Sequence, residues 1–198
     1  MVDFDKIWVE KYRPATLDDI ILDERTLKQV KEFEEEIPNL LFVGNPGTGK
    51  TTLARIIVND VLGCNYLYIN ASDESGIDTI RHNITNFAQT KSFDGKVKVV
   101  ILDEADGLTT QAQAALRNTM ETYAKYCRFI LTANYKHKII PAVQSRCQSL
   151  DIKPVVELAV KRCYNILKNE NIKVPEEQKK KFVQLVKRHF PDLRKTIN

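Results

Sequence analysis

The feature that most restricts how this chain can fold is an apolar run that leads directly into a glycine-rich turn. Leu40-Leu41-Phe42-Val43 is followed at once by Gly44-Asn45-Pro46-Gly47-Thr48-Gly49-Lys50-Thr51. A short apolar run bounded by turn residues suits a buried strand, and the residues after the turn suit a helix. The segment therefore predicts a strand, a tight turn and a helix in immediate succession.

The same alternation continues through the first 150 residues. Apolar, β-rich segments occur at 40–43, 66–70, 97–102 and 128–133. The stretches between them are long enough for helices at 51–62, 77–90 and 110–123. Strands that alternate with helices predict an α/β fold, in which crossover connections build a parallel sheet with helices on both faces.

The turn has the chemistry of a phosphate-binding loop, because it fits the pattern G-x-x-x-x-G-K-[ST] between a strand and a helix. Gly47 and Gly49 permit a backbone curl that aims successive N–H groups at phosphate oxygens. The helix that follows adds its partial positive N-terminal charge. Lys50 is expected to reach the β- and γ-phosphates, and the Thr51 hydroxyl to ligate Mg²⁺. The alternative is an ordinary glycine-rich turn.

Two carboxylates end the third apolar segment, where Val99-Val100-Ile101-Leu102 is followed by Asp103 and Glu104. Ligands bind at the carboxyl ends of strands in a parallel sheet. Asp103 is expected to hold the Mg²⁺ hydration shell, and Glu104 to act as the general base for an attacking water. The pair follows a phosphate loop, which favours hydrolysis over mere binding. Asp106 completes the string Asp103-Glu104-Ala105-Asp106, and a helix-capping or turn role is expected for it.

Composition excludes several classes of protein. With 198 residues, 43% of them hydrophobic, the chain is neither a collagen-like repeat nor a disordered segment. The apolar runs are far shorter than the roughly 20 residues of a membrane span, and the N-terminus does not read as a secretory signal. The four cysteines are scattered without a C-x-x-C pair, which predicts free thiols in a reducing compartment rather than a zinc ribbon or a disulfide framework.

Charge and composition predict a domain boundary near Pro154. Residues 1–150 carry a net charge of −2, whereas residues 151–198 carry +6. Beyond the boundary the pattern is helical, with helices expected at 155–170 and 176–190 and a third opening at Pro191, with Asp192 near its positive end. The predicted domains are therefore 1–152 and 153–198.

Several motifs together resemble the ATPase subunits of DNA sliding-clamp loaders, which belong to the AAA+ superfamily and include the replication factor C small subunits. The resemblance rests on the phosphate loop, Ile101-Leu102-Asp103-Glu104-Ala105-Asp106, Thr132-Ala133-Asn134, Ser145-Arg146-Cys147, Glu10-Lys11-Tyr12-Arg13-Pro14 and Asn70-Ala71-Ser72-Asp73. Further segments, including Phe190-Pro191-Asp192-Leu193-Arg194, are similar to the T-even bacteriophage version. The fold implied is a P-loop NTPase domain followed by an α-helical lid, with ATP and Mg²⁺ as cofactors.

The resemblance assigns three more catalytic or sensing roles. Asn134 would help position the hydrolytic water; its alternative is a turn-forming asparagine. Arg146 would enter a neighbouring subunit's site as an arginine finger, because a guanidinium is always charged and binds phosphate oxygens in pairs; its alternative is a surface salt bridge. Arg194 would contact the γ-phosphate from the lid, unless it is simply solvated.

The resemblance also assigns a nucleotide-binding surface beyond the loop. A tyrosine ring and apolar side chains near the N-terminus would face the adenine; the alternative for Tyr12 and Ile21 is a place in the core. Trp8 is expected to pack rather than to bind. The full expected set for the nucleotide is Val9, Glu10, Lys11, Tyr12, Ile21, Asn45, Gly47, Thr48, Gly49, Lys50, Thr51, Thr52, Asn134 and Arg194.

The partners implied are other clamp-loader subunits in a ring or spiral (a pentamer when full length), a sliding clamp, primer–template DNA and no membrane. Arg81 is the expected DNA contact, against the alternative of a solvated helix face. Lys179-Lys180-Lys181 is expected to be solvent-exposed helix. The expected location is the cytoplasm, a host's cytoplasm for a viral protein, or the nucleus in a eukaryote.

Relatives in this family carry a further C-terminal helical collar, so the lid is expected to be incomplete and the collar absent. The function indicated is ATP-driven opening of a ring clamp and its loading on DNA during replication. Two other functions stay open: a different AAA+ motor, such as a branch-migration helicase or a remodelling ATPase, and a regulatory subunit that binds ATP without hydrolysing it.

Overall fold

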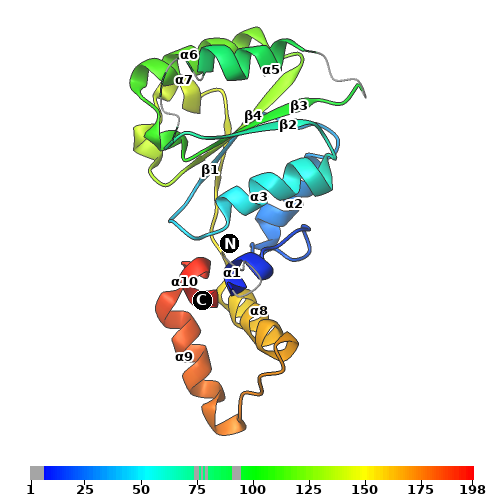
Figure 1. The fold of residues 1–198 in the computed structure, drawn as a ribbon, viewed down its shortest axis with the longest axis vertical. Helices are drawn as coiled ribbons and strands as arrows, with labels where there is room; N and C mark the ends of the chain where they lie inside the picture. The colour runs from blue at the N-terminus through cyan, green and yellow to red at the C-terminus, as the bar shows by residue number, and fades with distance from the viewer. Residues whose placement is uncertain (1–6, 74–75, 77, 79, 91–94) are drawn as a thin grey trace.

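A computed structural model describes residues 7–198 except 74–75, 77, 79 and 91–94, and it leaves the side chains of Ile80 and Arg81 undescribed. Within this described part, five parallel strands form one sheet in the order β2-β3-β4-β1-β5 (Figure 1). The strands are β1 (Leu40–Val43), β2 (Tyr66–Asn70), β3 (Lys98–Asp103), β4 (Cys127–Ala133) and β5 (Gln148–Asp151). The four predicted strands and the parallel sheet are confirmed.

The edge strand β5 was not predicted from the sequence. Its residues Gln148-Ser149-Leu150-Asp151 are largely polar, and only Leu150 is buried. It pairs with β1 along its whole length, from Leu40 opposite Gln148 to Val43 opposite Asp151. An edge strand that buries a single side chain has no apolar run to reveal it.

The register brings three strand ends together. Val43 lies opposite Ala133, and Asn70 lies opposite Asp103. Because β4 also pairs with β3, with Leu102 opposite Leu131, the residues that follow β1, β3 and β4 emerge side by side at one edge of the sheet.

Helices cover both faces of the sheet. On one face, α5 (Thr85–Gln89), α6 (Thr110–Thr122) and α7 (Pro141–Gln144) pack over a core that includes Phe129, Leu131 and Leu116. On the other face, α2 (Glu24–Glu32) and α3 (Lys50–Ile56) pack over Phe42, Ile101 and Ile130. Two π-helical turns, η2 (Ile57–Val61) and η3 (Ile80–Ile84), extend α3 and precede α5. The expected helices at 51–62 and 110–123 are therefore present; of the one expected at 77–90, residues 77 and 79 lie outside the described part.

The C-terminal residues form a helical unit below the sheet in Figure 1. It consists of α8 (Val156–Asn169), the 3₁₀ turn η6 (Glu176–Gln178), α9 (Lys179–His189) and α10 (Leu193–Ile197). The prediction placed Pro191 in the first turn of the last helix. Instead Pro191 follows a cis peptide bond outside the helix, and Asp192 is the N-cap, its carboxylate accepting from the Lys195 N–H at 3.1 Å.

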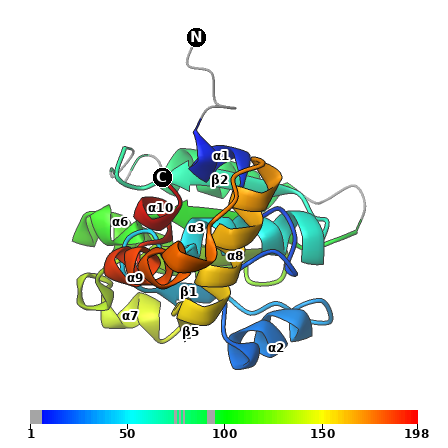
Figure 2. The same cartoon turned by 90° about the horizontal axis from the view of Figure 1, so that it is seen from below.

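The N-terminal segment joins this helical unit to the sheet. It contains the short helix α1 (Trp8–Lys11), and Figure 2 shows α1 beside α10 and α8. Ile21 is buried in a small core with Ala159, Cys163 and Val186 of the C-terminal helices. The lid is therefore fastened by apolar packing to a segment that comes from the other end of the chain.

Other sequence expectations concern the surface and the thiols. None of the four cysteines forms a disulfide, as expected, and Cys127 and Cys163 are buried. Lys179, Lys180 and Lys181 are exposed, as expected. Among the residues described, none of the helices has the length and apolar character needed to cross a bilayer.

Candidate functional site

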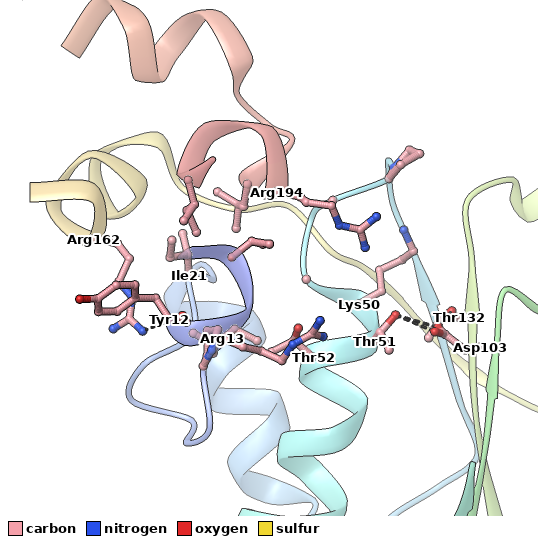
Figure 3. Close-up of a pocket in the computed structure, with 18 of the residues that line it drawn as sticks. Tyr12, Arg13, Ile21, Lys50, Thr51, Thr52, Asp103, Thr132, Arg162 and Arg194 are labelled. Atoms are coloured by element: carbon pink, nitrogen blue, oxygen red, sulfur yellow. Dashed lines mark hydrogen bonds between the residues drawn. The ribbon is translucent and has the colours of Figure 1, made fainter. Parts of the chain in front are cut away.

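One pocket opens where the strand ends, the start of α3, the N-terminal segment and the lid meet (Figure 3). Each of these four parts contributes side chains, so the wall joins residues that are far apart in the sequence. It is lined by Val9, Tyr12, Arg13, Pro14, Ile20, Ile21, Pro46, Gly47, Gly49, Lys50, Thr51, Thr52, Asp103, Glu104, Thr132, Asn134, Arg162, Leu193, Arg194 and Ile197.

The glycine-rich turn forms a curl around the Lys50 ammonium. Gly47 and Gly49 have φ angles of +77° and +94°, a left-handed backbone that glycine adopts without strain. Lys50 Nζ donates to the carbonyls of Gly44 and Asn45 at 2.8 and 2.9 Å and to Oδ1 of Asn134 at 2.8 Å. Burial lowers the pKa of Lys50, and the charge of Asp103 partly offsets that effect. The buried cation is thus held at the centre of the expected phosphate site.

The Asp103 carboxylate is the second centre of the site. The Thr51 hydroxyl donates to both of its oxygens, at 2.8 and 2.9 Å, as the dashed lines in Figure 3 show. Thr132 donates to Oδ1 at 2.6 Å and Tyr68 to Oδ2 at 2.8 Å. Burial, together with the hydrogen bond to Asp103, raises the pKa of Tyr68 to about 12, so the phenol remains a proton donor.

This oxygen pair fits Mg²⁺ held together with a nucleotide. Magnesium in phosphate sites takes one or two protein oxygens and fills its other positions with phosphates and water. Thr51 and Asp103 offer such a pair beside the phosphate loop. The described residues contain no cluster of three or more His, Cys, Asp or Glu that would hold a metal without a nucleotide.

Glu104, the expected general base, lines the pocket at a position open to solvent. It is exposed and has a left-handed backbone with φ +54°. The Ser72 hydroxyl donates to its carboxylate. The backbone N–H of Glu104 donates to Thr132 Oγ1 at 3.0 Å, so one threonine is bonded to both residues of the acidic pair.

The sequence predicts a helix-capping or turn role for Asp106, and Asp106 does lie in a turn, the 3₁₀ turn η4 (Ala105–Gly107). Its carboxylate accepts from the N–H groups of Asn134 and Tyr135 at 3.2 and 3.1 Å, a contact between strand ends that the sequence did not predict. Asp106 therefore joins the end of β3 to the end of β4. This contact holds the Asn134 backbone at the pocket, where its side chain meets Lys50.

The N-terminal segment places some of the expected nucleotide contacts on the pocket and others outside it. Val9, Tyr12 and Ile21 line the wall. Glu10 instead pairs with Arg13 at 2.6 Å, and its pKa is lowered chiefly by that hydrogen bond. Lys11 pairs with Glu170 of the lid at 2.6 Å, so the wall around these positions does not include the charges of Glu10 and Lys11.

In the phosphate loop too, some of the expected nucleotide contacts line the pocket and others do not. Thr51 and Thr52 line the pocket together with the glycines at 47 and 49. Asn45 and Thr48 do not line it: the Thr48 hydroxyl donates to the Asn45 carbonyl at 2.9 Å within the loop. Trp8, expected to pack, is likewise absent from the lining.

The lid closes the pocket through two arginines and a backbone contact. The Leu193 N–H donates to the Gly47 carbonyl at 3.0 Å, and Figure 3 shows Arg194 reaching from α10 toward Lys50, as expected for a lid arginine. Arg162 of α8 donates to the Tyr12 carbonyl at 3.2 Å and to Asp19 at 3.1 Å. Arg162 was missed from the sequence, because it stands in no motif and only the tertiary fold brings it here. Thr132 stands in the motif Thr132-Ala133-Asn134 but was assigned no role, because the register of β3 against β4 is what brings its hydroxyl to Asp103.

Two arginines that the sequence singled out are not part of this pocket as described: Arg146 lies outside it, and the side chain of Arg81 is not described. Arg146 follows α7, donates to Glu121 of α6 at 2.7 Å and to the Ala142 carbonyl at 2.6 Å, and does not line the pocket. The side chain of Arg81 lies outside the described residues. The expected DNA contact therefore stays a prediction. The ion pair of Arg146 with Glu121 matches the alternative of a surface salt bridge, and a role of Arg146 in a neighbouring subunit's site stays a prediction as well.

Comparison with known proteins gives two family matches. Residues 40–154 match the ATPase family associated with various cellular activities (AAA). Residues 151–198 match the AAA+ ATPase lid domain of the sliding-clamp-loader large subunit.

Among curated proteins, the replication factor C small subunit of Archaeoglobus fulgidus is 45% identical over 98% of this chain and 62% of its own length. Replication factor C subunit 3 of Blastobotrys adeninivorans is 43% identical over 96% of this chain and 58% of its own length. The chain thus spans about three fifths of the relatives it matches. Among solved structures, the RuvB Holliday junction branch migration motor of Thermotoga maritima has a TM-score of 0.73 at 18% identity, covering 92% of this chain and 62% of that one. That likeness shows the fold alone.

Proposed function

The chain belongs to the AAA family of ATPases, and from this premise we propose that it is an ATPase subunit of a DNA sliding-clamp loader. The observation that carries the proposal is the convergence of Lys50, Thr51, Asp103 and Asn134 under a lid that presents Arg194. The match of residues 151–198 to a clamp-loader lid and the names of the relatives support the specific assignment. ATP binding would organise an assembly that opens a ring clamp on primer–template DNA, and hydrolysis would release the closed clamp.

The residues divide the work of nucleotide binding and hydrolysis. Lys50 and the N–H groups of the curl would bind the phosphates, and the apolar wall with Tyr12 and Ile21 would take the adenine. Thr51 and Asp103 would hold Mg²⁺, which neutralises phosphate charge when it is bound with ATP. Glu104, at the exposed rim, would accept the proton of the attacking water, and Asn134 would orient that water.

Arg146 is assigned to a neighbouring subunit's site. It lies outside the pocket of its own chain, where Glu121 and the Ala142 carbonyl hold it. Its planar guanidinium is suited to binding the negative charge on a transferred phosphoryl group. The subunits are proposed to assemble as a ring or spiral, in which each pocket is completed by the next subunit.

The proposed domains are an ATPase domain, about 1–152, and a lid, about 153–198. The sheet ends at Asp151 and the helices resume at Val156, and the two family matches meet at 151–154. The protein is proposed to act where DNA is replicated, which is the cytoplasm (a host's cytoplasm for a viral protein) or, in a eukaryote, the nucleus. Arg81 remains the proposed DNA contact.

The test is phosphate release by the assembled subunits with clamp and primed DNA. Glu104→Gln should lower turnover by about 100-fold or more, because general-base catalysis contributes that much, while ATP binding persists. Unchanged turnover would remove Glu104 from the role of base. Wild-type protein that is stabilised by ATP but releases no phosphate would favour the binding-only regulatory subunit, and unwinding of DNA without any clamp would favour another AAA+ motor.

A mixing experiment tests whether Arg146 acts between subunits. Glu104→Gln and Arg146→Ala should each be nearly inactive alone. Mixed subunits should recover part of the turnover, because an intact Glu104 in one subunit then meets an intact Arg146 from another. If mixing restores nothing although the subunits assemble, Arg146 does not serve a neighbouring site.

A further inference from the structure

Tyr68 contacts Asp103, the carboxylate proposed to hold Mg²⁺, from a strand outside the phosphate loop and the acidic pair. It lies in β2, next to β3, and its phenol donates to Asp103 Oδ2 at 2.8 Å. The opposite oxygen, Oδ1, accepts from Thr132 at 2.6 Å. Asp103 is therefore held by one hydroxyl on each side, in addition to Thr51.

The three hydroxyls do not have equal roles once a divalent cation and a triphosphate are bound. The Thr51 hydroxyl is the proposed ligand of the cation and would then give up its donation to Asp103. Tyr68 and Thr132 would remain to fix the orientation of the carboxylate. Hydrogen bonds from such outer residues commonly set metal affinity by about 10–100-fold.

Tyr68 is itself held in place by a neighbouring side chain. The Arg55 guanidinium lies 4.6 Å from the centre of its ring, a cation–π contact that orients the phenol. The geometry is thus that of a prearranged donor rather than of an incidental surface hydroxyl.

We propose that Tyr68 is a positioning residue that sets the Mg²⁺ affinity of the nucleotide site by fixing Asp103 for coordination. The inference rests on the proposed ATP–Mg²⁺ function. It singles out Tyr68 over Thr132 because Thr132 Oγ1 also accepts from the Glu104 backbone, so a change there disturbs two residues at once. Tyr68→Phe removes the hydroxyl and keeps the ring that Arg55 contacts.

The experiment measures binding of a fluorescent ATP analogue at a series of free Mg²⁺ concentrations and in EDTA. For Tyr68→Phe, the Mg²⁺ concentration at half effect should rise about tenfold. Affinity in EDTA and the thermal unfolding midpoint without nucleotide should stay at the wild-type values. Tyr66→Phe is the matched control, since Tyr66 is an exposed tyrosine of the same strand that does not line the pocket; its Mg²⁺ response should equal that of the wild type.

A double-mutant cycle separates positioning from general structural damage. In an Asp103→Asn background, Tyr68→Phe should produce no further shift in the Mg²⁺ response, because both changes act through one carboxylate. A Tyr68→Phe response equal to wild type would overturn the inference. So would an equal weakening in EDTA, or full additivity in the cycle. Wild-type protein that fails to bind the nucleotide at all would instead overturn the proposed function.

Discussion

The two walls of the pocket are built in different ways. The sheet wall consists of Lys50, Thr51, Asp103 and Asn134, joined by direct hydrogen bonds of 2.8–2.9 Å. The lid wall is held by apolar packing around Ile21 and by polar contacts such as Lys11 to Glu170.

In the sheet wall the two charged groups, Lys50 and Asp103, are buried and hydrogen-bonded, whereas the polar contacts of the lid wall are largely exposed to solvent. Buried, paired charges resist rearrangement, and exposed ion pairs contribute little and are easily exchanged. The comparison teaches that the residues proposed to bind the phosphates are already held in place in this chain. Closure of the lid around the adenine instead depends on many small contacts.

The largest effect is expected on the sheet wall. Lys50→Ala should lower ATP affinity by about 100-fold, because loss of a buried, hydrogen-bonded cation costs at least about 2–5 kcal/mol. Adenosine, which has no phosphates, should bind as it does to the wild type. Binding of both ligands can be measured by isothermal titration, with the exposed lid lysine variant Lys180→Ala as the control. An equal loss for adenosine would show that the two walls are not independent.

The sheet wall was the part that the sequence could predict. Gly47, Gly49, Lys50 and Thr51 are consecutive or nearly so, and a strand–turn–helix places them without help from the rest of the chain. Asp103 was predictable because a parallel strand must end at the same edge. Its third hydroxyl partner, Tyr68, was not, since the register of β2 against β3 decides that contact.

The lid wall could be predicted only in part. Tyr12 and Ile21 were expected near the adenine, and both line the pocket. Arg162 was missed, because a single arginine in an amphipathic helix carries no signal of what it will face. The neighbouring Glu10 forms an ion pair with Arg13, and Lys11 forms one with Glu170. The sequence did not predict either pair, because side-chain reach in the folded chain decides which groups meet.

An intermediate effect is expected at Ile21, where apolar packing joins the lid to the part of the pocket proposed to bind the adenine. Ile21 is 6% exposed, and Ile21→Val should lower the free energy of unfolding by about 1 kcal/mol. Because the same side chain lines the pocket, ATP and adenosine should both bind up to about fivefold more weakly. Urea unfolding and titration measure the two quantities. Ile166→Val, a buried change in α8 outside the pocket, should lower stability without altering affinity; if it weakens binding equally, the effect at Ile21 is one of lid stability alone.

The smallest effect is expected at the exposed contact between the lid and the N-terminal segment. Glu170 accepts from Lys11 Nζ and from the Tyr12 hydroxyl, both at 2.6 Å, and these hydrogen bonds, Lys11's first, lower its pKa below the ordinary 4.5. Between the lowered and the ordinary pKa the unfolded chain binds more protons. The contact therefore stabilises the fold fully above pH 4.5 and loses that contribution as the pH falls through the lowered value.

Glu170→Gln should accordingly shift the urea midpoint slightly downward at neutral pH, because an amide can still accept from Tyr12 but has no charge for Lys11. The gap between variant and wild type should close as the pH falls below the ordinary pKa, whereas the control Glu177→Gln, an exposed lid glutamate, should show no such closing gap. ATP affinity should change by less than about twofold, as for other exposed ion pairs. A gap that persists in acid, or a loss of ATP affinity comparable to that of Ile21→Val, would mean that the polar contacts of the lid wall carry more of its closure than the packing around Ile21 does.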